Sequence, residues 1–83
     1  MNLNVMTKKE KLRKEFLSNP RGLDYKKIIT LLLSEWYEIH LWKWSHVKVE
    51  FIRTWEYFTV PLHNWDCKWL YKDKLREFYL KNN

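Results

Sequence analysis

The 83-residue sequence is poor in the residues that bend, break or cross-link a chain: it has one glycine, two prolines and one cysteine. The lone Cys67 cannot form an internal disulfide, which favours a reducing, cytoplasmic setting. With a single glycine there is no glycine-rich loop to cradle a phosphate, which excludes nucleotide-binding proteins built on such a loop. The composition, 46 % hydrophobic and 31 % charged, is that of a globular domain.

Long apolar runs are also absent. The longest extends over Ile28–Leu33 and is interrupted by Thr30, whereas a membrane-spanning helix needs about 20 apolar residues. The lysine-rich segment follows the first apolar residues instead of preceding them, which is the reverse of a signal peptide. We therefore expect no membrane association, and a chain of this length has room for one small domain.

Positive charge is concentrated in the two terminal segments. The net charge is +6, of which residues 7–17 contribute +3 (five Lys/Arg, two Glu) and residues 66–83 contribute +2 (five Lys/Arg, three Asp/Glu). An uneven basic excess favours a polyanionic partner, and nucleic acid is the first to consider. The alternative is an ordinary solvated surface that keeps the protein soluble.

The hydrophobic pattern changes from helical spacing to strand alternation and back again. Thr7, Asp24 and Asp66 can each cap a helix. Short connections between the alternating segments favour an antiparallel meander with one apolar and one wet face. The pattern predicts an α+β fold of order α-α-β-β-β-α, a two-layer sandwich with helices on one face of a three-stranded sheet. The expected elements are helices at 7–18, at 25–33 and from Asp66 to the C-terminus, and strands at 37–42, 46–51 and 57–63.

The wet face of the predicted sheet carries histidines, and His46 is the candidate for catalysis. Imidazole has the unperturbed pKa nearest neutrality, so it can act as a general acid or base. A base that takes the proton from an RNA 2′-hydroxyl lets that oxygen attack the adjacent phosphate without a metal. Ser45 could orient a group, and Lys43 and Lys48 lie close enough in sequence to hold phosphate. The alternative is a solvent-facing strand histidine, because one histidine is a weak signal.

A metal site is not expected. His63, Asp66 and Cys67 are residue types that bind zinc, but the sequence has no Cys-x-x-Cys or His-x-x-x-His pair. In the alternative interpretation Asp66 caps a helix, Cys67 is a small buried residue and His63 ends a strand.

The stretch "KWSHVKVEF…YFTVPLHNWDCKWLYKDKL" resembles the HicA family of toxin–antitoxin toxins. Members carry Gly-Ser-His at the start of the second strand, an apolar-Pro-x-His segment on the third, and then a terminal helix. Ser45-His46, Val60-Pro61-Leu62-His63 and Lys72–Leu80 match in order and spacing. The resemblance covers roughly residues 23–80, so we interpret 1–22 as an N-terminal helical extension and 23–83 as the HicA-like domain of a single globular unit.

The resemblance implies a concrete function. HicA proteins have a double-stranded-RNA-binding-like fold and act as ribonucleases on mRNA, with the histidine of Gly-Ser-His as the catalytic residue, here His46. No metal or other cofactor is required, and no small-molecule ligand is expected. A HicB-like antitoxin binds the toxin and covers the active site. Ser45, His63 and the residue at position 44 would support the site.

The sequence departs from the family at Trp44, which stands where the family has glycine. Three more of its six tryptophans, Trp36, Trp55 and Trp65, occupy turn or loop positions, and two of these favour glycine: the end of a helix and the turn of a hairpin. Some bacteria read the UGA codon as glycine, and a translation that reads UGA as tryptophan would write glycine as tryptophan. We hypothesise that several of these residues are misread glycines. The rival hypothesis is that they are genuine and provide aromatic surface for RNA or a partner.

Two other functions fit the same fold. One is a non-catalytic RNA-binding module that holds RNA by shape and phosphate contacts. The other is a protein-interaction domain whose exposed aromatic residues dock a partner.

Overall fold

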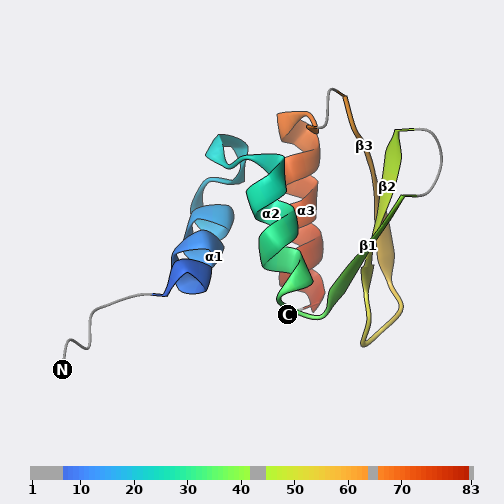
Figure 1. Cartoon of the computed structure of the whole chain (residues 1–83), viewed down its shortest axis with the longest axis horizontal. Helices are drawn as coiled ribbons and strands as arrows, with labels where there is room; N and C mark the ends of the chain where they lie inside the picture. Colours follow the sequence, from blue (N-terminus) through green and yellow to red (C-terminus); the bar gives the residue numbers. More distant parts are fainter. Residues whose placement is uncertain (1–6, 42–44, 64–65, 83) are drawn as a thin grey trace.

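The computed structural model describes residues 7–41, 45–63 and 66–82, and these form three α-helices, one 3-10 turn and a three-stranded sheet (Figure 1). The order α-α-β-β-β-α predicted from the sequence is confirmed. The elements are α1 (Lys8–Ser18), η1 (Pro20–Gly22), α2 (Tyr25–Leu33), β1 (Tyr37–Leu41), β2 (His46–Phe51), β3 (Tyr57–Pro61) and α3 (Trp69–Asn82).

The sheet is an antiparallel meander with β2 in the centre, in the order β1-β2-β3. Helices α2 and α3 cover one of its faces, and α1 packs on the side of α2 that is turned away from the sheet (Figure 1). No helix of the described residues lies over the other face of the sheet. Among the described residues, no helix is long and apolar enough to cross a membrane.

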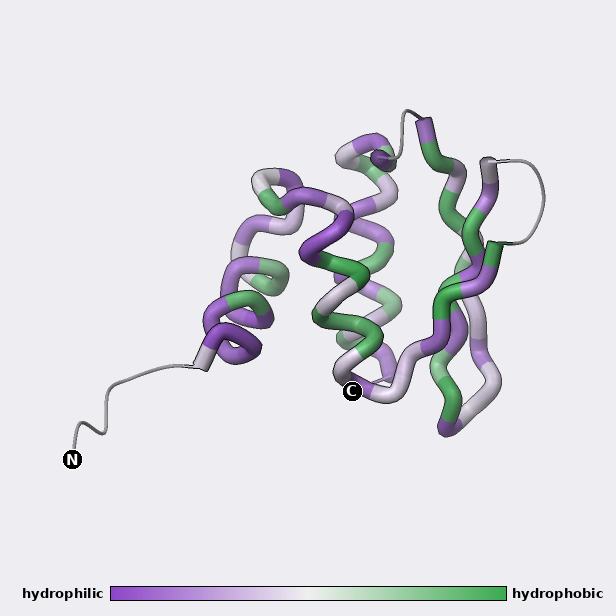
Figure 2. Tube along the Cα trace, viewed as in Figure 1, coloured by the Kyte–Doolittle hydropathy of each residue, from purple (hydrophilic) through white to green (hydrophobic). Residues whose placement is uncertain are grey.

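The core lies between the sheet and the helices. Alternation in the strands turns Tyr37, Val49 and Val60 inward, all nearly or fully buried. Hydrophobic residues recur along α2, α3 and the strands, whereas α1 is largely hydrophilic (Figure 2). The buried hydrophobic residues are Phe16, Leu23, Tyr25, Ile28, Leu31, Leu32, Tyr37, Val47, Val49, Phe51, Val60, Cys67, Leu75 and Tyr79.

Helix α1 contributes to this core in spite of its hydrophilic surface. Phe16 is 0 % exposed and meets the ring of Tyr79 edge-on, with the ring centroids 5.5 Å apart. Arg13 pairs with the nearly buried carboxylate of Glu35 at 2.5 Å, and the Tyr79 hydroxyl donates to the same carboxylate at 2.5 Å. These contacts tie α1 to the end of α2 and to α3, so the helical extension shares one core with the rest of the chain.

Two of the three predicted helix starts are confirmed. The Thr7 hydroxyl accepts from the Glu10 N–H at 3.1 Å, and the Asp24 carboxylate accepts from the Lys26 N–H. The start predicted at Asp66 is wrong, because α3 begins at Trp69. The Asp66 carboxylate instead accepts from the N–H of the next residue.

The third strand is shorter than expected. It ends at Pro61, and His63 leaves the ladder to form an isolated bridge with Asp66. The His63 N–H donates to the Asp66 carbonyl at 2.6 Å, and the Asp66 N–H donates back at 3.1 Å. This pair turns the chain between the end of β3 and the start of α3.

The two described positions that favour glycine do have a left-handed backbone. The φ angle is 72° at Trp36, between α2 and β1, and 64° at Trp55, in the turn between β2 and β3. Trp44 and Trp65 lie outside the described residues.

Candidate active site on the uncovered face of the sheet

The uncovered face of the sheet, called the open face below, presents polar side chains in rows across the strands. The strand register sets Glu38 opposite Glu50, His40 opposite Lys48, and His46 opposite Pro61. The open face comprises Glu38, His40, His46, Lys48, Glu50, Tyr57 and Thr59. Glu38 and Glu50 make one end of the open face acidic. His40 and Lys48 lie in its middle, and the candidate catalytic residue His46 lies at the other end.

His46 is the first residue of β2, and its side chain is exposed to solvent. Within the described part of the chain its imidazole has no hydrogen bond or ion pair, so both ring nitrogens remain available to a substrate. The backbone around it is fixed, because the Leu62 N–H donates to the Ser45 carbonyl at 2.7 Å. The Ser45 main chain thus holds the start of β2 against the end of β3, whereas the predicted role of Ser45 in the site stays a prediction.

His63 follows Pro61 by two residues, so the chain brings it to the same end of the sheet as His46. It borders a hollow of about 490 Å³ between the end of β3 and the start of α3. Lys68 and Tyr71 also line this hollow, and the sequence analysis did not single them out. The described residues that line it are Pro61, Leu62, His63, Lys68, Leu70 and Tyr71.

Lys48 lies next to His46 on the open face, but its ammonium group has other partners. Its Nζ is 3.7 Å from a Glu50 carboxylate oxygen and 4.9 Å from the centre of the Tyr57 ring. Both partners lie on the side of Lys48 that is away from His46. A phosphate at His46 would therefore have to compete with Glu50 for this lysine. Lys43, the other lysine predicted to hold phosphate, lies outside the described residues.

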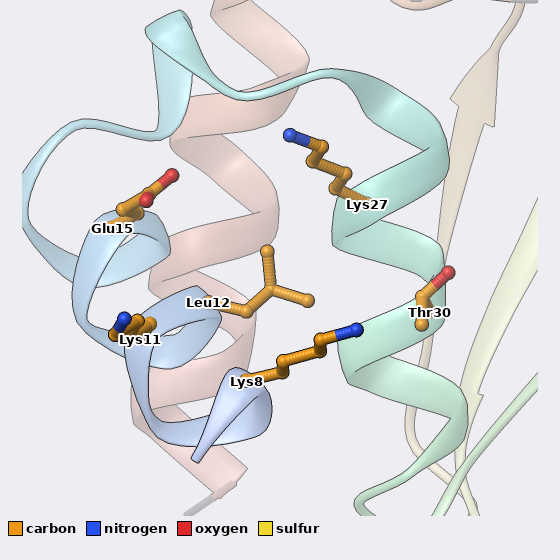
Figure 3. A pocket seen from close by; sticks show the side chains of 6 residues that line it. All are labelled: Lys8, Lys11, Leu12, Glu15, Lys27 and Thr30. Carbon is orange, nitrogen blue, oxygen red and sulfur yellow. The ribbon is translucent and has the colours of Figure 1, made fainter. Parts of the chain in front are cut away.

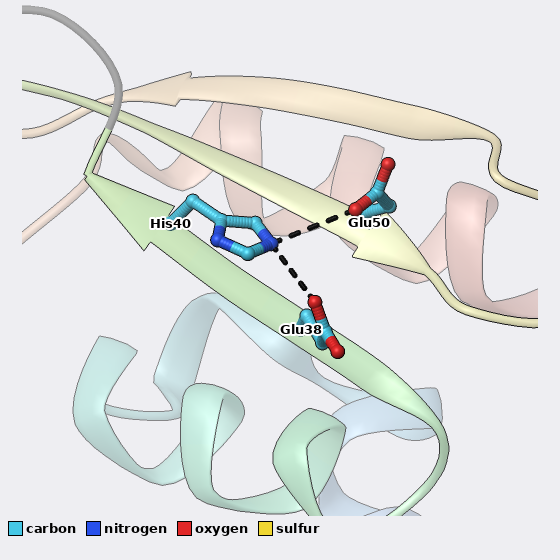
Figure 4. Close-up of side chains that lie close together, drawn as sticks. All are labelled: Glu38, His40 and Glu50. Carbon is cyan, nitrogen blue, oxygen red and sulfur yellow. Dashed lines mark ion pairs between the residues drawn. The ribbon is translucent and has the colours of Figure 1, made fainter.

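A second cluster occupies the acidic end of the open face. The His40 Nε2 atom lies 3.1 Å from a Glu38 oxygen and 3.5 Å from a Glu50 oxygen (Figure 4). Glu38 and Glu50 face each other across two strands, and like charges in that arrangement repel. The His40 ring nitrogen lies within 3.5 Å of both carboxylate groups. The three ligand atoms are all within 4.8 Å of one another, a spacing that could also admit a divalent cation.

The sequence pattern missed this cluster because it did not fix the strand register. Alternation put His40 on the wet face, but the pairing of Glu38 with Glu50 depends on how the chain turns between β1 and β2. Because β1 ends at Leu41 and β2 begins at His46, the two strands are further apart in sequence than in the two-residue hairpins whose register can be read from the sequence.

The three zinc-type residues after β3 are arranged differently. Cys67 is buried, and burial raises the pKa of its thiol to about 11, which keeps it protonated at neutral pH. Asp66 lies 3.7 Å from the Lys72 ammonium group, itself nearly buried. In the described part of the chain, His63, Asp66 and Cys67 do not bring their ligand atoms together as Glu38, His40 and Glu50 do.

A groove of about 350 Å³ between α1 and α2 gathers part of the basic charge (Figure 3). Lys8 and Lys27 extend from the two helices toward the space between them, and Lys11 and Glu15 border it. Leu12 and Thr30 also line it. This groove lies across the helices from the sheet, so its lysines are remote from His46.

The chain has no match among protein-family models, among curated proteins or among solved structures.

Proposed function

We propose that this protein is a ribonuclease toxin of the HicA type, which cleaves mRNA in the cytoplasm and is neutralised by a HicB-like antitoxin. The observation that carries the proposal is the exposed His46, free of partners among the described residues, at the end of an uncovered sheet face. The α-β-β-β-α order of the chain after residue 22 supports the double-stranded-RNA-binding-like fold that the resemblance implies. The net charge of +6 suits a polyanionic substrate.

In this proposal His46 acts as the general base. Its neutral imidazole takes the proton of a ribose 2′-hydroxyl, and the 2′-oxygen attacks the adjacent phosphorus. The bond from phosphorus to the 5′-oxygen breaks, and that oxygen takes a proton as it leaves. The products are a 2′,3′-cyclic phosphate and a 5′-hydroxyl, so the reaction consumes no water, metal or redox partner. His63, which the chain brings to the same end of the sheet as His46, is the candidate acid.

Cations near the hollow would stabilise the charge that builds on the phosphate. Lys68 lines the hollow beside His63, and within the described residues it has no ion pair. Lys48 would contribute only when it releases Glu50. We therefore assign the first phosphate contact to Lys68, and Lys48 a secondary one.

The same features support a second candidate function, RNA binding without cleavage. The lysine groove between α1 and α2 lies away from His46 and could bind a phosphate backbone regardless of any catalysis. Such binding would weaken steeply as salt rises. A protein-docking function, based on exposed aromatic side chains such as Trp55 and Tyr57, would depend on salt far less.

Induction in a bacterial host tests the proposal. Four forms are compared for growth and for intact mRNA: the chain as given, Trp44→Gly, and each of these with His46→Ala. The proposal expects arrest and mRNA loss with at least one His46 form, and recovery of both when His46→Ala is added. His40→Ala on the same face is the matched control and should leave the arrest intact. Folded, soluble His46 forms that are all harmless would overturn the ribonuclease proposal.

A further inference from the structure

Two tryptophans occupy backbone positions that favour glycine. Trp36 and Trp55 have φ angles of 72° and 64°, in the left-handed region where a Cβ atom crowds the following carbonyl oxygen. Asn and Asp are the side chains that most often tolerate this region, and for a bulky aromatic it is an outlier. They are the only non-glycine residues with positive φ among those the structure describes.

The surrounding fold fixes both backbones in this conformation. The Trp36 carbonyl accepts from the Ile52 N–H at 2.9 Å, which anchors the start of β1 beside the end of β2. The Trp55 N–H donates to the Phe51 carbonyl at 2.9 Å and closes the β2–β3 turn. A left-handed residue at this place in a short hairpin loop is usually glycine.

The indole rings of Trp36 and Trp55 make no ring or cation contact within the described residues that would offset that strain. The side chains of Trp36 and Trp55 are 65 % and 69 % exposed, and within the described residues neither ring stacks on another ring or on a cation. Trp69 differs, because it lies in α3 and the Arg21 guanidinium sits 4.1 Å from its ring centre. Among the described residues, no ring or cation contact of either indole therefore offsets the strain at positions 36 and 55.

We propose that positions 36 and 55 are glycine in the functional protein, and that its gene encodes them with UGA codons that the source cell reads as glycine. The composition agrees with this. An average glycine usage of about 7 % gives about six glycines in a chain of this length, whereas the sequence has one glycine and six tryptophans.

If codon 44 were also UGA and read as glycine, residues 44–46 would be the Gly-Ser-His motif of the HicA family. That extension rests on the proposed function, because Trp44 lies outside the described residues and its only support is the HicA resemblance. The proposal for positions 36 and 55 rests on backbone geometry, so it can hold or fail independently of the ribonuclease activity.

The first test is to read codons 36 and 55 in the gene and to sequence the protein isolated from its own cells. Tandem mass spectrometry of the tryptic peptides 28–43 and 54–68 covers both positions. The proposal expects UGA codons and glycine masses. A UGG codon or a tryptophan mass at either position overturns it there, and the exposed indole then becomes a candidate docking residue.

The second test asks whether glycine fits the fold better. In the chain as given, Trp36→Gly and Trp55→Gly should each raise the melting temperature by roughly 4–8 °C, because glycine removes the crowded Cβ. Trp36→Ala and Trp55→Ala are the matched controls, since they remove the indole and keep the Cβ. They should gain much less. Equal melting temperatures for the glycine and alanine variants would show that φ strain is not what distinguishes these positions.

Discussion

The two faces of the sheet differ in what holds their side chains. On the helix side, Tyr37 packs against Phe51 and Tyr79, and the Glu35 carboxylate has partners from α1 and α3. On the open face His46 has no hydrogen bond or ion pair among the described residues, and the contacts found there are ion pairs and the Lys48 ammonium group beside the Tyr57 ring. The side chains on the helix side are held in place by packing, whereas those on the open face are available for contact with another molecule.

This difference separates stability from activity. Removing a side chain on the helix side leaves a cavity or an unpaired polar group, so the free energy of unfolding should fall. Removing an exposed side chain on the open face leaves neither, so the fold should survive and only function should change.

The largest effect is expected for His46→Ala on RNA cleavage. Loss of a general base typically costs a factor of about 10²–10⁴ in rate. The melting temperature should stay within about 2 °C of the parent, because the side chain is exposed and has no hydrogen bond or ion pair among the described residues. Cleavage of a labelled RNA by the purified protein, with His40→Ala as the matched control, measures the first quantity. A large loss of stability in His46→Ala would contradict the separation of the two faces.

The next effect is expected for Phe16→Ala in α1. Phe16 is completely buried and meets Tyr79, so its removal should lower the free energy of unfolding by about 3–5 kcal/mol. Leu12→Ala, at a partly buried position of the same helix, should cost clearly less. Urea unfolding measures both. If Phe16→Ala were nearly neutral, residues 1–22 would be an independent extension and not part of the common core.

A smaller effect is expected for Glu35→Gln. The amide keeps the shape of the side chain but removes the negative charge that pairs with Arg13 and accepts from the Tyr79 hydroxyl. We expect a loss of about 1–3 kcal/mol, below that of a core cavity because Arg13 is partly exposed. Tyr79→Phe removes one hydrogen bond from the same network and should cost about 1 kcal/mol. A loss in Glu35→Gln no larger than in Tyr79→Phe would mean that the charge contributes nothing.

The sequence predicted the fold where the signal is local. Alternation placed His46 and Lys48 on the open face, and turn preferences identified Trp36 and Trp55 as left-handed positions. The pattern failed where tertiary contacts decide. Asp66 is a residue type that favours helix caps, but here it forms a bridge with His63. Helix α3 therefore begins later, at Trp69.

The site was predictable only in part for the same reason. Alternation placed His46 on the open face, and the HicA resemblance made it the candidate base, a role that stays a prediction. The hollow that brings Lys68 and Tyr71 beside His63 forms between a strand end and a helix start, and no spacing in the sequence encodes it. The partners of Lys48 likewise depend on the strand register, which alternation alone leaves open.

The smallest effect is expected at the edge of the helix side, for Arg21→Ala. The Arg21 guanidinium donates to the Asp73 carboxylate at 2.8 and 3.0 Å and covers the Trp69 ring, but it is exposed, so the melting temperature should fall only slightly.

Hydrogen bonds from Arg21 lower the pKa of Asp73 in the folded protein. A depressed carboxyl pKa stabilises the fold above the unfolded-state value of about 3.9 and loses that contribution as pH falls through the folded-state value. The gap in melting temperature between the parent and Arg21→Ala should therefore narrow below about pH 4, and only the Trp69 contact should remain in strong acid. A gap that is the same at pH 7 and in strong acid would assign the whole effect to the Trp69 ring and none to the ion pair.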